Sequence, residues 1–282
     1  MPDNYRFPDY PELSESYDII VCGAGPAGAT CALALGTSGL RVALVEKGHF
    51  PRDKVCGDAL AAYIPKVLHT INPHYAEAMK SLSVNNPVNS IRIIAPDSRS
   101  IDLQFKESGS VIKRRHFDAF LFDLVTELPN IHVFQDTQIN KVEVRKGSVK
   151  AQADDGRELQ SQIVVGCDGS QSRVRRLPHG SGIDREFHAG GVRAYFKQVK
   201  DVEQNRIEFI FMKDLLPFYL WIFPLHDRLV NVGLGMLSEQ LSEKTISLRN
   251  ALPDLIEQEP HLKERFSNAV RLSEIEGCGL PL

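Results

Sequence analysis

The fold is decided by one short stretch near the start of the chain, Asp18-Ile19-Ile20-Val21-Cys22-Gly23-Ala24-Gly25-Pro26-Ala27-Gly28. Its first half is apolar and rich in β-branched residues, which is typical of a buried parallel strand. Small and apolar residues then run from Pro26 to Gly36 and predict a helix with proline in its first turn. Beyond Gly39, the run from Arg41 to Glu46 predicts a second strand. Together these elements form a βαβ unit, whose crossover is right-handed.

The loop between the first strand and the helix has the pattern G-x-G-x-x-G. Gly23 permits a tight turn, Gly25 lets the backbone approach a pyrophosphate, and Gly28 lets the helix pack on the strand. The helix N-terminus offers N–H groups to the phosphates, and Glu46 ends the next strand, where an acid binds ribose hydroxyls. The alternative is a glycine turn without a ligand, and the pattern does not distinguish FAD from NAD(P). The expected dinucleotide contacts are Gly23, Gly25, Pro26, Ala27, Gly28, Glu46 and Lys47.

The rest of the chain mixes helical and strand patterns. Residues 51–80 look like loop and irregular helix, and alternation over 89–105 predicts a hairpin. A single apolar stripe predicts a helix over 117–128. Further strands are expected around Val133, Val142 and Val149, over 162–167, and as a mixed sheet beyond Arg185.

Composition is that of an ordinary globular protein, with 43% hydrophobic and 24% charged residues in 282. A formal charge of −3 without a long basic run gives no indication of nucleic-acid binding. No apolar run reaches the roughly 18–20 residues that span a bilayer. The polar segment from Met1 to Tyr17 does not resemble a signal peptide. Five cysteines without metal or Cys-x-x-Cys spacing suggest reduced thiols, so we expect a cytoplasmic protein and no metal site.

A second motif selects FAD. Asp168-Gly169-x-x-Ser172-x-Val174-Arg175 follows an apolar strand and resembles the D-G motif of flavoprotein hydroxylases. The resemblance implies that Asp168 lies near the flavin ribityl chain and pyrophosphate, with Gly169 in the turn. Arg114 matches the family arginine that contacts the flavin cofactor at a helix start. The alternatives are a helix-capping turn for Asp168 and an exposed charge for Arg114.

Two further stretches resemble the geranylgeranyl reductase family. The segment Pro51–Leu60 is similar to one that carries a Cys-Gly beside the flavin, which adds Arg52, Cys56 and Gly57 to the expected cofactor contacts. Tyr219-x-Trp221-x-Phe223-Pro224 is similar to the family motif P-x-x-Y-x-W-x-F-P, which lines an isoprenoid cavity. Period two places Tyr219, Trp221 and Phe223 on one strand face as a substrate wall. The leading proline, Pro217, is one residue closer to the tyrosine than in that motif. The alternative is a plain core strand.

Reductases of this kind need a proton donor, and the sequence does not identify one. Cys56 and Tyr219 are the candidates for a catalytic role. Arg52 and Lys54 could lower the pKa of the Cys56 thiol if they point toward it. The alternative for Cys56 is a buried spectator thiol.

The resemblance implies an α/β fold with a three-layer, Rossmann-like FAD-binding domain of the glutathione-reductase type, interleaved with a mixed-sheet α+β substrate domain. We expect a lead-in over 1–17, the FAD domain over 18–80 and 114–180, and the substrate domain over 81–113 and 181–282. The family's third flavin motif, a Gly-Asp after the substrate sheet, is missing, which suggests C-terminal truncation.

The implied function is FAD-dependent reduction of carbon–carbon double bonds in a prenyl lipid, with NAD(P)H or reduced ferredoxin as electron donor. A flavin monooxygenase or halogenase is one alternative, and a flavoprotein remnant without catalysis is the other. The expected partner is a small apolar molecule. A lipid substrate makes peripheral membrane contact natural, although no amphipathic basic helix supports it. The oligomeric state stays open.

Overall fold

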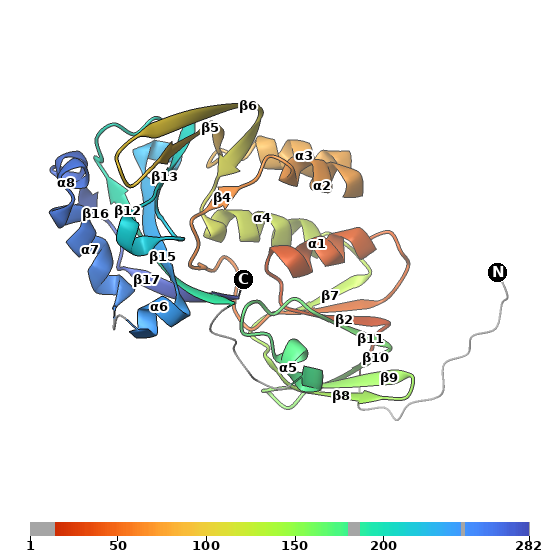
Figure 1. Cartoon of the computed structure of the whole chain (residues 1–282). Coiled ribbons are helices and arrows are strands. Elements are labelled where there is room, and N and C mark those ends of the chain that lie inside the picture. Colours follow the sequence, from red (N-terminus) through yellow and green to blue (C-terminus); the bar gives the residue numbers. More distant parts are fainter. Residues whose placement is uncertain (1–14, 180–186, 244–245, 282) are drawn as a thin grey trace. The chain divides into compact units, whose positions relative to one another are not determined.

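The computed structural model describes residues 15–179, 187–243 and 246–281 (Figure 1). The chain divides into two compact units. Unit 1 comprises Met1–Phe50 and Leu121–Ser181, and unit 2 comprises Pro51–Phe120 and Gly182–Leu282. The units therefore change over at residues 50/51, 120/121 and 181/182, where the sequence analysis expected changes at 80/81, 113/114 and 180/181. Most of the expected lead-in, residues 1–14, lies outside the described residues.

Unit 1 is built on a parallel sheet in which β2 (Ile19–Cys22) is flanked by β3 (Val42–Val45) and β11 (Ile163–Gly166). β7 (Ile131–Phe134) completes it beside β3, and every pairing is parallel. All residues of β2 and β3 are buried, as their apolar runs predict. The helix between them, α1 (Pro26–Leu35), confirms the predicted βαβ unit.

A second, smaller sheet covers the face of the parallel sheet that α1 leaves open (Figure 1). Its strands are β1 (Glu15–Ser16), β10 (Glu158–Ser161), β9 (Ser148–Ala153) and β8 (Ile139–Arg145). Its inward side chains pack on Ile20, Cys22 and Val45, and Tyr17 joins this core at 5% exposure. Helix, parallel sheet and mixed sheet form the expected three layers.

Unit 2 is a mixed sheet that, within the described residues, has nine strands. The hairpin predicted over 89–105 is present as β5 (Asn86–Ile94) and β6 (Ser100–Val111). β5 pairs in parallel with β13 and antiparallel with β6, which makes the sheet mixed, as predicted. The remaining strands are β4 (Ala59–Leu60), β12 (His188–Lys197), β13 (Arg206–Ile210), β14 (Leu220–Pro224), β15 (Val230–Leu237), β16 (Val270–Arg271) and β17 (Glu276–Pro281).

Helices cover one face of this sheet (Figure 1). Leu220, Ile222 and Val232 point to that face and pack with Leu252 and Leu262 of the helices. The helices are α6 (Ser238–Glu243), α7 (Leu248–Gln258) and α8 (Pro260–Phe266). The opposite face carries the predicted substrate wall.

Four further helices differ from the sequence expectations or add to them. The segment expected to be loop and irregular helix contains two regular helices, α2 (Ile64–Ile71) and α3 (Pro73–Lys80), and Asn72 caps the second one. The helix predicted over 117–128 is α4 (Arg114–Thr126) and begins earlier. α5 (Arg173–His179) follows the D-G motif, and the short helical turns are Lys213–Leu215 and His226–Arg228. None of the described helices has both the length and the apolar character needed to span a bilayer.

Candidate functional site

The glycine loop of unit 1 has the close packing that the G-x-G-x-x-G pattern predicts. Gly23 has a φ of +97°, and a Cβ there would lie 2.4 Å from the carbonyl oxygen of Cys167. A Cβ on Gly28 would lie 1.7 Å from the carbonyl oxygen of Gly23. Only glycine fits either position, so α1 begins directly against the end of β2. Gly25 is the N-cap residue, and no side chain caps the helix there.

Glu46 closes the same edge of the sheet at the end of β3. Its Oε2 accepts a hydrogen bond from the backbone N–H of Ala24 at 2.8 Å, and its Oε1 accepts one from Gly48 at 3.0 Å. Glu46 is 4% exposed. Its two hydrogen bonds tie the glycine loop to the end of β3. A carboxylate oxygen accepts more than one hydrogen bond, so ribose hydroxyls are compatible with this arrangement. Lys47, next in the chain, is exposed.

Asp168 begins the turn after β11, beside the glycine loop. Its Oδ2 accepts from the backbone N–H groups of Arg173 at 2.6 Å and Val174 at 3.4 Å, so it caps α5. Its Oδ1 is buried and has no hydrogen-bond partner among the described residues. Gly169 has a φ of +79° and open space where a Cβ would be. Asp168 can therefore cap α5 with its Oδ2 and still offer its Oδ1 to a ligand.

These features fit the adenosine and diphosphate part of FAD. The carboxyl ends of β2, β3 and β11 meet at one edge of a parallel sheet, where such folds bind nucleotides. An open helix N-terminus suits a diphosphate, and the buried Oδ1 of Asp168 is an acceptor without a donor.

In unit 2, the guanidinium of Arg114 is directed at a carboxylate. Its Nε and Nη2 donate to both oxygens of Asp118, at 2.6 and 2.9 Å, and Asp118 is 1% exposed. Arg52 also donates to Asp118, at 3.2 Å. Arg114 is therefore not the exposed charge of the alternative reading.

Lys54 and Arg52, which could lower the pKa of Cys56 if they pointed toward it, each have a hydrogen-bond partner elsewhere in unit 2. Lys54 donates to the Sγ of Cys278 at 3.1 Å, and Arg52 donates to Asp118. Arg114 lies beside Cys56. Burial lowers the pKa of its guanidinium, but the hydrogen bond to Asp118 and the charge of Asp118, with Cys56, raise that pKa above its ordinary value.

The predicted aromatic row is present, and it is wider than the motif. Tyr219 contacts Trp221, and Trp221 contacts Phe223, with ring centroids 6.4 and 6.1 Å apart. Phe209, on the neighbouring strand β13, stacks edge-on against Tyr219 and Phe223, and Phe211 adds a further contact to Tyr219. Burial raises the pKa of the Tyr219 hydroxyl above its ordinary value of 10.

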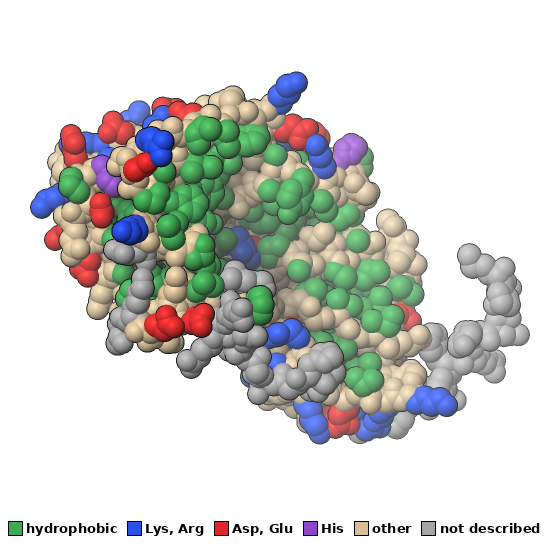
Figure 2. Space-filling view, in the orientation of Figure 1, with side chains coloured by type: hydrophobic (Ala, Val, Ile, Leu, Met, Phe, Trp, Pro, Cys, Tyr) green, Lys and Arg blue, Asp and Glu red, His purple; other side chains and the backbone are tan. Residues whose placement is uncertain are grey.

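Cross-strand pairing continues this row into an aliphatic surface. Trp221 pairs with Phe209, Phe209 with Ile93, and Ile93 with Ile101, so these four side chains lie on one face. We call this row, with Ile91 and Leu103 beside it, the apolar face. Ile101 is 56% and Leu103 is 37% exposed. Figure 2 shows hydrophobic side chains gathered over β5 and β6 of this unit.

On the same face of the sheet, the strands on the other side of β14, which are β15 and β12, carry polar residues. Tyr195 and Asn231 each donate to the Oδ2 of Asp58 at 2.8 Å, and the backbone N–H of Arg114 donates to its Oδ1 at 3.0 Å. Asp58 and Asn231 are fully buried. Arg193, 1% exposed, is paired with Asp53 at 2.8 Å and with Glu276 at 2.7 Å, and its guanidinium lies 4.4 Å from the Tyr195 ring centre.

With this geometry described, comparison with known proteins gives the family. A model described as "FAD binding domain" matches residues 16–214. The chain belongs to the FAD binding domain family. A second model, "Geranylgeranyl reductase catalytic domain", matches residues 190–273, which include β14 with Trp221 and Phe223. The resemblance to geranylgeranyl reductases is thereby confirmed.

Curated proteins and solved structures are similar to this FAD-binding chain over most of its length. It is 25% identical over 245 residues to digeranylgeranylglycerophospholipid reductase 1 of Methanococcoides burtonii, with 82% of this chain and 57% of that protein covered. The chain therefore spans little more than half of that relative's length. A geranylgeranyl bacteriochlorophyll reductase-like structure from Thermoplasma acidophilum superimposes with a TM-score of 0.79 at 23% identity, covering 95% of this chain and 67% of that one. The structure of a flavin-dependent brominase superimposes with a TM-score of 0.77 at 20% identity, covering 94% of this chain and 67% of that one.

The sequence analysis of this FAD-binding chain missed the polar side of the sheet face. No local pattern in the sequence marks Asp58 or Arg193 as a site residue. The extension of the aromatic row to Phe209 depends on the pairing of β13 with β14, which period two along one strand does not specify. No local pattern indicates that Asp58, Tyr195 and Asn231 meet.

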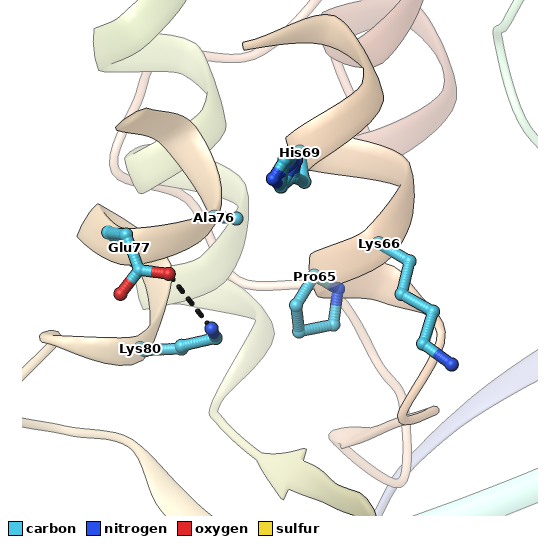
Figure 3. Close-up of a pocket in the computed structure, with 6 residues that line it drawn as sticks. All are labelled: Pro65, Lys66, His69, Ala76, Glu77 and Lys80. Atoms are coloured by element: carbon cyan, nitrogen blue, oxygen red, sulfur yellow. Dashed lines mark hydrogen bonds and ion pairs between the residues drawn. The ribbon is translucent and has the colours of Figure 1, made fainter. Parts of the chain in front are cut away.

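A groove on the surface of α2 and α3 contains none of the predicted site residues. Figure 3 shows its two walls, with Glu77 and Lys80 joined at 2.9 Å. Its lining residues are Pro65, Lys66, His69, Ala76, Glu77 and Lys80. The solvated charges indicate an ordinary helix–helix surface.

Proposed function

We propose that this protein is an FAD-dependent oxidoreductase that reduces carbon–carbon double bonds of a prenyl lipid. The observation that carries the proposal is the apolar face of unit 2, which begins at the motif residue Trp221 and continues without a polar side chain through Phe209 and Ile93 to Ile101. The geranylgeranyl reductase catalytic domain match covers the aromatic part of it.

The width of this face suits a long hydrocarbon. Strands in a sheet lie about 4.8 Å apart, so the three steps from β14 to β6 span about 14 Å. Its side chains are half-buried or exposed although they are large and apolar, and an exposed apolar surface of this kind marks a binding region. A prenyl chain would bury these side chains without leaving polar groups unpaired.

The proposed cofactor contacts are assigned separately in each unit. In unit 1 we assign the glycine loop, Glu46 and Asp168 to the adenosine and diphosphate. In unit 2 we assign Cys56 and Gly57, with Arg52 and Arg114 behind them, to the flavin end. When bound and reduced, FAD supplies a hydride to the substrate double bond.

The protein's own groups would orient the chain and supply the proton. The aromatic row fixes the prenyl chain on the sheet and excludes water, and a proton must reach the second carbon of the bond. Tyr219 is one candidate donor, because it supplies the hydroxyl group of the aromatic row. Cys56 is the second candidate. NAD(P)H or reduced ferredoxin would return electrons to the flavin, and an isoprenoid lipid would bring the protein to a membrane surface.

The test combines FAD, the purified chain and a geranylgeranyl phospholipid under anaerobic conditions with dithionite as reductant. We expect product masses that increase by one hydrogen molecule per reduced bond. Oxygenated or halogenated product in air, without reduced lipid, would instead indicate the monooxygenase or halogenase alternative. A chain that acquires no flavin absorbance with FAD would contradict the cofactor assignment.

A further inference from the structure

Asn231 joins the Trp221 indole to the Cys56–Asp58 segment through one amide group. Its Oδ1 accepts from the indole Nε1 of Trp221 at 2.9 Å. Its Nδ2 donates to the carbonyl oxygen of Cys56 and to the Oδ2 of Asp58, both at 2.8 Å. The side chain is fully buried, so both N–H donors are satisfied inside the protein rather than by solvent.

The segment that Asn231 holds lies directly against the aromatic row. A Cβ on Gly57 would be 3.0 Å from Cε2 of Phe223 and 3.4 Å from Nε1 of Trp221. The backbone of this segment therefore lies on the two aromatic rings with no room for a side chain between them. Asp58 follows with a φ of +67°, held by Tyr195 and by the N–H of Arg114.

We propose that Asn231 is a positioning residue, which holds the Cys56–Gly57 segment and the Trp221 indole in fixed register for the reaction. The effect of this role on turnover rests on the proposed function. The position of the Cys56–Gly57 segment relative to the Trp221 indole can be measured without substrate. One amide orients both a segment assigned to the cofactor and the ring at which the apolar face begins. Loss of either arm would displace one of them relative to the other.

The protein contains one tryptophan, so its fluorescence reports on Trp221 alone. Asn231→Leu removes all three hydrogen bonds at similar volume. Asn231→Asp keeps an acceptor for Trp221 but loses the donors to Cys56 and Asp58. Asn86→Leu is the matched control, because Asn86 is also buried in this sheet and its Nδ2 donates to two carbonyls, those of Gln204 and Pro224.

Two measurements need no activity. In Asn231→Leu the emission of Trp221 should move to shorter wavelength, since the indole N–H loses its acceptor, whereas Asn231→Asp and Asn86→Leu should keep the wild-type spectrum. Alkylation of Cys56 by iodoacetamide, mapped by mass spectrometry against Cys31, should accelerate in both Asn231 variants and not in Asn86→Leu. Equal Cys56 alkylation in the wild type and a folded Asn231→Asp would overturn the proposal.

Turnover supplies the third measurement. With anaerobic reduction of the geranylgeranyl phospholipid as assay, kcat of Asn231→Asp should fall by about a hundredfold with KM little changed, as expected for displaced reacting groups. Asn86→Leu should keep wild-type kcat. Unchanged kcat in Asn231→Asp would overturn the positioning role. If the wild type reduces no lipid, the proposed function fails, while fluorescence and alkylation still decide whether Asn231 fixes the register.

Discussion

Gly233 lies directly beneath the indole of Trp221: a Cβ placed on Gly233 would be 2.3 Å from Cζ2 of that ring and 2.2 Å from the carbonyl oxygen of Val192. The two residues are cross-strand partners in β14 and β15. The absence of a side chain at Gly233 thus lets the tryptophan lie flat on the sheet. The same row continues on its other side to Arg193 and Glu276, so it changes from charged to apolar at this glycine.

We expect Gly233→Ala to destabilise the protein by about 1–3 kcal/mol, as overpacking does. The added methyl group meets backbone on one side and a held indole on the other, and neither can move cheaply. The measurement is urea unfolding followed by Trp221 fluorescence. Gly191→Ala is the control, because its Cβ would have an ordinary contact 3.8 Å from Leu234 and should change stability by less than about 0.5 kcal/mol. Equal stabilities of the two variants would contradict the packing argument.

The glycine loop of unit 1 gives a second prediction. Gly28→Ala places a methyl group on the carbonyl oxygen of Gly23, which forces α1 away from β2 and should abolish FAD binding. Visible flavin absorbance after FAD addition and desalting measures this. Gly36→Ala, at the other end of the helix, meets the ends of the Leu128 side chain and, at 3.2 Å, the carbonyl oxygen of Leu33, and should keep flavin. Flavin retained by Gly28→Ala would show that the loop does not hold the cofactor.

The two oxygens of Asp168 can be tested separately. Asp168→Asn keeps an oxygen to cap α5 but puts an amide donor in place of the unpartnered Oδ1, so stability should stay near wild type while FAD affinity falls. Asp168→Ala should lose both, with a stability cost of about 1 kcal/mol from the lost cap. Fluorescence titration with FAD and urea unfolding give the two readouts. If Asp168→Asn binds FAD as the wild type does, Asp168 has only the capping role.

Asp58 gives a pH prediction. Burial raises the pKa of its carboxyl above the ordinary 3.8, although hydrogen bonds from Asn231, Tyr195 and Arg114 and the charge of Arg193 oppose it. The folded protein therefore holds this proton more tightly than the unfolded chain, and the stability from Asp58 falls as pH rises from 3.8 through the folded pKa. The unfolding free energy of the wild type minus that of Asp58→Asn should thus decrease with pH in this window.

Asp102, which is exposed, is the comparison residue for that experiment, because its contribution to the unfolding free energy should change with pH in the opposite direction. The hydrogen bond from Arg92 lowers the pKa of its carboxyl, so its contribution is present above the ordinary pKa and is lost as pH falls. The difference between wild type and Asp102→Asn should therefore grow with pH at the acid end. Slopes of the same sign for the two variants would contradict the assignment for Asp58.

Cys22 gives a chemical prediction. Burial, with the charges of Asp168 and Cys167, raises the pKa of its thiol to about 12. At pH 8 it should therefore resist alkylation in the folded protein and react only after unfolding in urea. Peptide mapping measures this directly, with Cys31 as the half-buried comparison. Alkylation of native Cys22 at the rate of Cys31 would contradict a closed core behind the glycine loop.

The sequence predicted most of unit 1 because its signals are local. The apolar run before Gly23, the glycine spacing and the acid at Glu46 each concern neighbouring residues, and each has the expected structure. Predictions were weaker between residues 51 and 80, where no sustained periodicity marks α2 and α3. The cations near Cys56 in sequence turned to other partners, since side-chain direction depends on the surrounding fold.

By itself the sequence determined the dinucleotide-binding βαβ unit, the D-G turn, the hairpin and the aromatic row on one strand face, because strand and helix periodicities and glycine conformations act over a few residues. Only the tertiary structure decided that Asp58, Tyr195 and Asn231 share one buried network, and that Phe209, Ile93 and Ile101 extend the row from Trp221. Those residues are far apart in the chain, and their contacts depend on strand order and register, which local patterns do not specify.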